Sequence, residues 1–282
     1  MPSIVISFAV LTAIFLSIAA LERVKGLQYV DKPVPRPWYR TDIGWYFVAA
    51  VSAGLSTFLL RPILVHLAIP GVSSVVGSLP TGWSLVVAVV VFDGVFFTVH
   101  RALHRSDRLW VVHKVHHSSR HLDVLATTRT HAFEHLVRNV PAQLTLFAFG
   151  FAPQTIAASV LVIGGFGALN HSNLRLPLHS LEWLLITPRL HRLHHVPDTT
   201  LNNYATVFSF WDRACGSLVR AETAPSTALG VPGEVDSYPQ SFPMAFREPA
   251  RQIRLDRRGA SRLASKSDPV VDEQATARDQ AA

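Results

Sequence analysis

Cysteine is almost absent from this 282-residue chain, which contains only Cys215. A single thiol excludes an intrachain disulfide framework, a cysteine-rich zinc module and an iron–sulfur cluster held by this chain alone. Charged residues are also scarce, at 16% of the chain, well below the roughly 25% of a typical soluble domain. Because the apolar fraction is 49%, this balance indicates a membrane protein. Any bound metal must be held by histidine or carboxylate groups.

The net charge of +7 raises the question of a nucleic-acid partner. The basic residues form no patch or motif typical of nucleic-acid binding, and they follow the hydrophobic segments instead. Membrane topology explains this distribution, because loops rich in Lys and Arg stay on the cytoplasmic side. We therefore expect no nucleic-acid partner.

Four apolar regions organise the chain. The first has no basic segment before it, which favours an uncleaved transmembrane helix over a secretory signal. The last is interrupted by Gly150 and Pro153, so we expect a helical hairpin that enters and leaves on one side. Proline-rich residues 22–44 form a connector in which a helix is not expected. The apolar regions cover residues 4–21, 44–69, 85–99 and 140–169.

The distribution of Lys and Arg predicts one topology. Residues 22–44, 101–138 and those after 171 would be cytoplasmic, and the loop 70–84 would lie outside. The expected fold is all-α: an integral membrane protein with about four membrane helices or hairpins and a cytoplasmic, histidine-rich helical cap. We divide the chain into N-terminal transmembrane helices with their connector (1–84), a catalytic domain (85–245) and a disordered tail (246–282). The tail shows no periodicity, and we expect it to be dispensable for metal binding and activity.

Histidine is unusually common, with 14 residues in this chain. Residues three and four positions apart share one helix face, so an HxxxH or HxxHH sequence presents two or three imidazoles together. One HxxHH would arise by chance with a probability of roughly 3%, the cube of the histidine frequency times the length. Two are present, which predicts metal binding. The four clusters are His100/His104, His113/His116/His117, Asn170-His171-Ser172-Asn173 and His191/His194/His195.

The metal site is expected to be rich in nitrogen ligands. There is no HExxH sequence, which disfavours a zincin protease. A bundle-type di-iron carboxylate site would need several Glu residues, and only Glu134 and Glu182 lie near the clusters. Neutral imidazole binds Fe, Zn, Cu and Ni alike, so the pattern alone leaves the metal open.

Further motifs resemble the fatty acid hydroxylase/sterol desaturase superfamily. The similarity covers about residues 93–217 and extends beyond the histidines. An acidic residue precedes the first histidine cluster by seven positions, and a tryptophan precedes the first HxxHH. The resembling residues are Asp93, Trp110, Arg129-Thr130-His131-Ala132-Phe133-Glu134, Asn170-His171-Ser172-Asn173, Thr187-Pro188, Asn203-Tyr204 and Trp211-Asp212-Arg213.

This resemblance implies an enzyme that uses two Fe ions (zinc being a possible substitute), O₂ and an external electron donor to hydroxylate or desaturate a lipid. The donor would be a ferredoxin or a b-type cytochrome with its reductase. The lipid would be a fatty acyl, sterol or related isoprenoid compound. The implied ligands are His100, His104, His113, His116, His117, His171, His191, His194 and His195, with His131 as a further ligand or an outer partner. Glu134, Asn170 and Asn203 are implied as residues that support the ligands.

Asp93 has two interpretations. An acid within an apolar helix is costly and predicts a functional role. Because it lies seven residues before His100, it could accept a hydrogen bond from a ligand histidine. Alternatively, it could form a hydrogen bond that packs two membrane helices together.

The remaining motif residues have structural interpretations. The Asn203-Tyr204 and Trp211-Asp212 pairs are expected to brace the fold after the last cluster. A different class of protein also remains open, namely a histidine-ligated zinc hydrolase or a non-catalytic metal-binding membrane protein. Four histidines outside the clusters are interpreted as structural or surface residues: His66, His121, His135 and His179.

Overall fold

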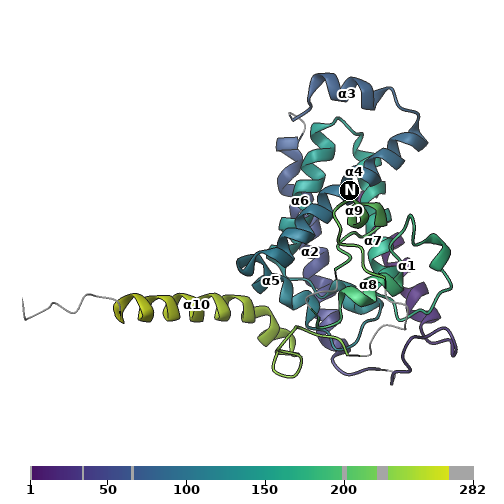
Figure 1. Ribbon diagram of the computed structural model, residues 1–282. Helices are drawn as coiled ribbons and strands as arrows, with labels where there is room; N and C mark the ends of the chain where they lie inside the picture. Colours follow the sequence, from purple (N-terminus) through teal and green to yellow (C-terminus); the bar gives the residue numbers. More distant parts are fainter. Residues whose placement is uncertain (1, 34, 65–66, 199–201, 221–227, 267–282) are drawn as a thin grey trace, which may run out of the picture.

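A computed structural model describes residues 2–33, 35–64, 67–198, 202–220 and 228–266. Within these ranges the chain is all-helical, as predicted (Figure 1). Extended pairing in the described residues is limited to two isolated bridges, Gln28–Leu174 and Leu185–Phe208. Both bridges tie connecting segments together at the edge of the helical bundle.

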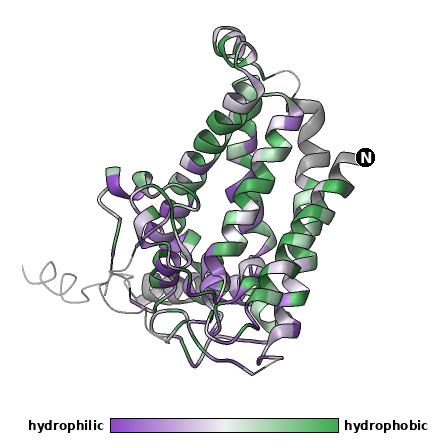
Figure 2. Cartoon of the chain, turned by 90° about the vertical axis from the view of Figure 1, so that its right-hand side faces the viewer, coloured by the Kyte–Doolittle hydropathy of each residue, from purple (hydrophilic) through white to green (hydrophobic). Residues whose placement is uncertain are grey.

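Five long helices stand side by side in the bundle (Figure 1). Hydrophobic residues dominate most of their length, and hydrophilic residues gather at the end where the short helices lie (Figure 2). Among the described residues, α4 and α7 are long and apolar enough to cross a membrane. With a rise of about 1.5 Å per residue, the 25-residue α4 is about 37 Å long. The five are α1 (Pro2–Leu21), α2 (Tyr39–Leu64), α4 (Thr81–Arg105), α6 (Ala132–Ala148) and α7 (Pro153–His171).

Short helices form a cap at one end of this bundle, which we call the histidine end. α4 finishes there and leads directly into the cap, and α7 also ends there at His171. The cap contains α5 (Asp107–His117), the 3₁₀ turns η1 (Val124–Thr128) and η2 (His179–Leu181), α8 (Pro188–His194) and the start of α10 (Phe242–Lys266). α9 (Ser209–Ala214) packs beside α4.

The hairpin predicted for residues 140–169 is present as α6 and α7. Gly150 adopts a positive φ of 80° in the turn between them, a conformation that favours glycine. A Cβ at Gly150 would lie 2.4 Å from Ser73, so the turn packs tightly against α3 (Pro70–Gly77) at the far end of the bundle. The expected loop 70–84 thus contains a short helix, which begins with Pro70 in the first turn.

A hydrophobic core fixes α4 against α6 and α7. It includes Phe92 and Phe96 of α4, Leu146 of α6 and Ile163 of α7, all of which are buried. The opposite side of α4 carries Gly94, where a Cβ would lie 2.7 Å from the ring of Trp211. Glycine therefore allows the segment that contains α9 to approach α4 closely.

The connector is non-helical in its described residues from 22 to 38, as predicted, but the prediction is wrong over residues 39–44, which already belong to α2. Buried Arg36 pairs with Asp42 of α2 at 2.5 Å and with Asp123, which caps η1. Arg129 reaches the other oxygen of Asp42 at 2.6 Å. These paired charges fasten the connector to the cap, and each buried ion has a partner of opposite sign.

The prediction of a disordered tail is wrong over residues 246–266, because α10 continues to Lys266. Its first turns pack against α2: the ring of Phe242 lies 5.0 Å from the ring of Trp45, and Ala245 is buried. Lys114 of α5 also bonds Gln252 at 3.1 Å. The spacing of Phe242, Phe246 and Pro249 follows a helical period that the basic composition obscured.

Removal of all residues after 250 is expected to leave the metal content and the activity of detergent-purified protein unchanged. The truncation keeps the contacts of Phe242 and Ala245 with α2 and removes no histidine. Metal analysis and a turnover assay on the truncated and full-length chains would test this. A truncated protein that folds but loses metal would contradict it.

Candidate metal centre

Nine histidines converge at the histidine end of the bundle in two groups that could each hold a metal ion. Within each group the candidate ligand atoms all lie within 4.8 Å of one another. The first histidine group consists of His100, His104, His113, His117 and His194. The second histidine group consists of His116, His171, His191 and His195.

Each HxxHH sequence contributes to both groups. On α5, the i,i+4 pair His113 and His117 joins the first group, while His116 joins the second. On α8 the pattern is exchanged: the i,i+4 pair His191 and His195 joins the second group, while His194 joins the first. Residues four apart point in one direction and the intervening residue diverges, so the two boxes interlock around two centres.

The long helices make the two groups unequal. α4 supplies an i,i+4 pair, His100 and His104, to the first group. α7 supplies only His171 to the second group, and the position one turn earlier is Gly167. The second group therefore has four histidines where the first has five.

The protonation pattern of the imidazoles fits bound cations. His100 Nδ1 donates to the carbonyl of Tyr204 at 2.6 Å, and His113 Nδ1 donates to Glu134 Oε1 at 2.8 Å. In a neutral imidazole the other nitrogen, Nε2, then carries a lone pair. The Nε2 atoms of His100 and His113 nevertheless face each other at 3.1 Å. Two lone pairs so close repel each other unless a cation lies between them.

The second histidine group repeats this arrangement. His116 Nδ1 bonds the carbonyl of Arg129 at 3.3 Å, and His171 Nδ1 donates to the carbonyl of Gly167 at 2.8 Å. Their Nε2 atoms are 3.1 Å apart. Metal–imidazole bonds of about 2.1 Å at right angles would place two nitrogens about 3.0 Å apart. The observed separations therefore match neighbouring ligands of one ion.

Burial keeps the cap histidines neutral. Desolvation lowers the pKa of His116, His117, His191 and His195 well below the ordinary value, and it lowers the pKa of His194 to about 3. Neighbouring histidines lower these pKa values further. Neutral imidazole is the form that binds metal, so no proton has to be displaced near neutral pH.

Side chains around the first group orient and cover it. Glu134 is buried and accepts hydrogen bonds from His113 Nδ1 and, at 3.0 Å, from Arg138. In metal sites, a carboxylate acceptor of this kind fixes the tautomer of a ligand histidine. The Trp110 ring lies 5.0 Å from His104 and 5.3 Å from His117, so its apolar surface borders the site.

Two carboxylates hold the segment that contacts His100. Asp93 accepts hydrogen bonds from the backbone N–H groups of Thr206, Val207 and Phe208 at 3.1, 3.0 and 2.8 Å. Asp212 accepts from the N–H groups of Tyr204 and Ala205 at 2.9 and 2.8 Å. Five successive N–H groups are thereby fixed, and the carbonyl of Tyr204 is held against His100.

Neither interpretation of Asp93 describes this contact. Asp93 binds no histidine directly, and its partners are backbone groups of a connecting segment and not a second membrane helix. Its link to His100 runs along the segment 204–208, in which Asp93 holds residues 206–208 and Asp212 holds Tyr204, the residue that contacts His100. The bracing role expected for Asp212 agrees with its contacts.

Asn170 and Asn203 also support backbone segments. The Asn170 side chain donates to the carbonyl of Thr206 at 2.7 Å, directly beside its neighbour His171. The Asn203 side chain donates to Leu190 of α8 and accepts from Val219 at 2.8 Å, and its own φ is 73°. Asparagine tolerates this left-handed conformation better than most residues. Each amide therefore ties a helix that carries clustered histidines to a connecting segment.

His131 lies outside both histidine groups. Its Nδ1 accepts from Phe133 N at 3.2 Å and caps α6, and its ring packs against Phe246. Three of the histidines expected to have structural or surface roles, His121, His135 and His179, also lie outside the groups. The fourth, His66, falls outside the described residues.

Several partners of the clustered histidines could not be predicted from residue types. The acceptors for Nδ1 of His100, His116, His171 and His194 are backbone carbonyls, including that of Asn202 at 3.0 Å from His194. A backbone carbonyl is present at every position, so no residue type marks it. Arg129 could have been found, since it begins the motif that ends at Glu134.

Comparison with known proteins agrees with this site. Residues 85–217 match the family model of fatty acid hydroxylases, and this range includes all nine clustered histidines. No solved structure matches.

Three similar curated proteins act on lipids according to their names. An ornithine lipid hydroxylase of Rhizobium tropici is 30% identical over 159 residues, which cover 55% of this chain and 48% of that protein. Alkylglycerol monooxygenases of Danio rerio and Xenopus tropicalis are 29% and 28% identical, over 49% and 44% of this chain and 31% and 28% of their own lengths. The chain thus spans about half or less of the curated relatives that it matches.

Proposed function

We propose that this chain, whose residues 85–217 match the family model of fatty acid hydroxylases, is a membrane-bound, non-haem di-iron oxygenase that hydroxylates a lipid. The observation that carries the proposal is the pair of histidine groups with lone pairs directed at two common centres. The names of the relatives, a hydroxylase and monooxygenases, favour hydroxylation over desaturation.

The first and second histidine groups would each hold one iron ion. When bound, the two irons supply the activation of O₂. The protein holds the ligand imidazoles neutral and in one tautomer through Glu134 and the backbone acceptors. Trp110 and the buried packing around α5 and α8 would exclude water from the oxidising centre. Since the second group has one histidine fewer, we propose that the open side of the centre faces it.

The substrate would reach the site from the bilayer. We propose that the apolar helices guide a lipid chain towards the histidine end, where His171 closes α7. A ferredoxin or a b-type cytochrome with its reductase would supply electrons, because the sequence contains no dinucleotide-binding glycine motif.

Metal analysis combined with isotope labelling tests the function. Protein purified without added metal should contain two irons per chain. Cells that express the chain under ¹⁸O₂ should contain a lipid with one ¹⁸O atom that is absent from cells lacking the gene. A protein that contains zinc alone and leaves the lipid profile unchanged under O₂ would favour the hydrolase or the non-catalytic alternative instead.

The proposed topology places α3 outside the cell and the histidine end in the cytoplasm. With Cys215 replaced by serine, we expect a cysteine at the exposed position Ser78 to react with an impermeant thiol reagent on intact cells. A cysteine at Lys25, which is exposed after α1, should react only after permeabilisation. Labelling of Lys25→Cys on intact cells would show that the histidine end lies outside, the opposite of the proposed topology.

A further inference from the structure

α10 leaves the bundle sideways. It starts against α2 and α5 at the histidine end and then runs across the direction of the long helices (Figure 1). Ala245, Glu248 and Pro249 are buried against the bundle, whereas every described side chain from Ile253 to Asp256 is exposed. Most of the helix therefore projects beyond the bundle that anchors it.

The exposed part of α10 carries apolar side chains on one face and arginines on another, where the exposed side chain of Leu255 also lies beside Arg251 and Arg254. Phe246 and Ile253, seven residues apart, share one face and are 39% and 38% exposed. Arg247, Arg251 and Arg254 follow the spacing i, i+4, i+7 and share another face, and all three are exposed. The sequence of α10 contains seven Lys or Arg residues and two acidic residues, Glu248 and Asp256.

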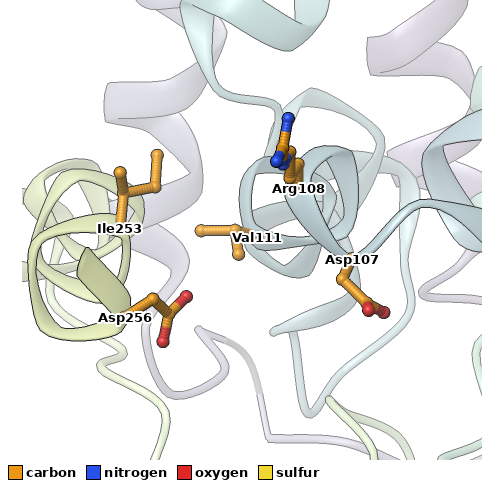
Figure 3. A pocket seen from close by; sticks show the side chains of 5 residues that line it. All are labelled: Asp107, Arg108, Val111, Ile253 and Asp256. Carbon is orange, nitrogen blue, oxygen red and sulfur yellow. The ribbon is translucent and has the colours of Figure 1, made fainter. Parts of the chain in front are cut away.

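The bundle does not cover the apolar face. A cleft of about 470 Å³ separates α10 from α5, and Ile253 faces Val111 across it (Figure 3). Charged residues of both helices border the cleft: Asp107 and Arg108 on α5, and Asp256 on α10. Towards the root of the helix, Phe246 lies 5.8 Å from Trp45 of α2 and stacks on its ring. The apolar face thus continues the surface of a long helix of the bundle.

We propose that α10 is an interfacial helix that docks on an anionic phospholipid surface. Phe246 and Ile253 would face the acyl chains, and Arg247, Arg251 and Arg254 would lie at the headgroup phosphates. A helix with one apolar and one strongly basic face, running across the membrane direction, has the composition and placement of an interfacial helix. The inference rests on the proposed topology, which puts the root of α10 near the cytoplasmic leaflet.

Spin labels on full-length protein in vesicles test this inference. In a Cys215→Ser background, one cysteine is placed at Ile253 and, as the matched control, one at Arg254. A third is placed at Val86, an exposed position of the membrane-spanning candidate α4. The vesicles contain phosphatidylcholine alone or with about one third phosphatidylglycerol, since anionic lipid attracts basic segments. The readout is label accessibility to O₂, which partitions into lipid, against a water-soluble nickel chelate.

With phosphatidylglycerol, the Ile253 label should match the Val86 label, and the Arg254 label should remain accessible to nickel. Replacing Arg247 and Arg251 with Gln should weaken lipid insertion of the Ile253 label by roughly fivefold per arginine, with metal content unchanged. Equal nickel accessibility at Ile253 and Arg254, with Val86 in lipid, would overturn the inference but not the topology. A Val86 label in water would overturn both. Dipolar broadening of the Ile253 label that disappears on dilution with unlabelled protein would show that the apolar face of α10 contacts a second copy of the chain. This result would also overturn the inference.

Discussion

Replacement of His116 by alanine is expected to remove the metal of the second histidine group and to abolish turnover. This group has four histidines, and His116 Nε2 lies 3.1 Å from His171 Nε2. Its loss would leave three ligands, so both the affinity and the geometry of the remaining site change. Mutation of a residue that hydrogen-bonds a metal ligand typically lowers metal affinity or activity by about 10–100-fold. Removal of a ligand itself should therefore lower them by more than about 100-fold.

His194→Ala provides the corresponding test of the first group. That group has five histidines, so we expect the mutant to retain more metal than His116→Ala while still losing activity. Metal content per chain and O₂-dependent lipid oxidation should be measured together. Since each residue belongs to a different group, each substitution should mainly affect one of the two metals. A His116→Ala protein with both metals and normal oxidation would refute the ligand assignment.

Two histidines outside the groups serve as controls. His179 is largely exposed, and its alanine variant should retain metal and activity. His131→Ala should also retain both metals, although loss of the α6 cap is expected to cost about 0.5–2 kcal/mol of stability. If folded His131→Ala protein contained one metal ion fewer than the parent, His131 would have to be a metal ligand.

Much of the helix pattern could be predicted because hydrophobic runs carry their own signal. The apolar stretches became α1, α2, α4 and the α6–α7 hairpin, and the turn at Gly150 followed from glycine and proline chemistry. α10 was missed because tertiary contact with Trp45, and not apolar composition, stabilises its first turns. The number of membrane spans and their orientation stay predictions.

The residues of the candidate site could be predicted from the sequence, but their grouping and their hydrogen-bond contacts could not. Spacing on a helix face indicated eight of the nine clustered histidines, and the resemblance of Asn170-His171-Ser172-Asn173 to a family motif indicated His171. Sequence could not assign His116 and His117, which are adjacent, to different groups, because this depends on how α5 and α8 face each other. Nor could it place Asp93 against residues 206–208, which are more than one hundred positions away.

Asp93→Ala is expected to impair the first histidine group without removing any ligand. The substitution leaves the N–H groups of Thr206, Val207 and Phe208 without their carboxylate acceptor in a buried site. Each buried donor that loses its partner costs about 1–3 kcal/mol, so the segment should shift or loosen. Asp212 would still hold the N–H groups of Tyr204 and Ala205, but the loosened segment after them should weaken the 2.6 Å bond between the carbonyl of Tyr204 and His100 Nδ1.

The expected result is a loss of about 10–100-fold in activity or metal affinity, the range for residues that orient ligands. The metal of the first group should be weakened more than that of the second, because the segment bonds His100 directly through the carbonyl of Tyr204, whereas it meets the second group only through Asn170 beside His171. Asp93→Asn keeps one acceptor oxygen, so its activity and metal affinity should lie between those of the parent protein and those of Asp93→Ala. Asp31→Ala, at an exposed acid in the connector, is the matched control. Equal loss of both metals in Asp93→Ala would indicate general unfolding, and unchanged metal affinity and turnover would show that the 204–208 segment does not position His100.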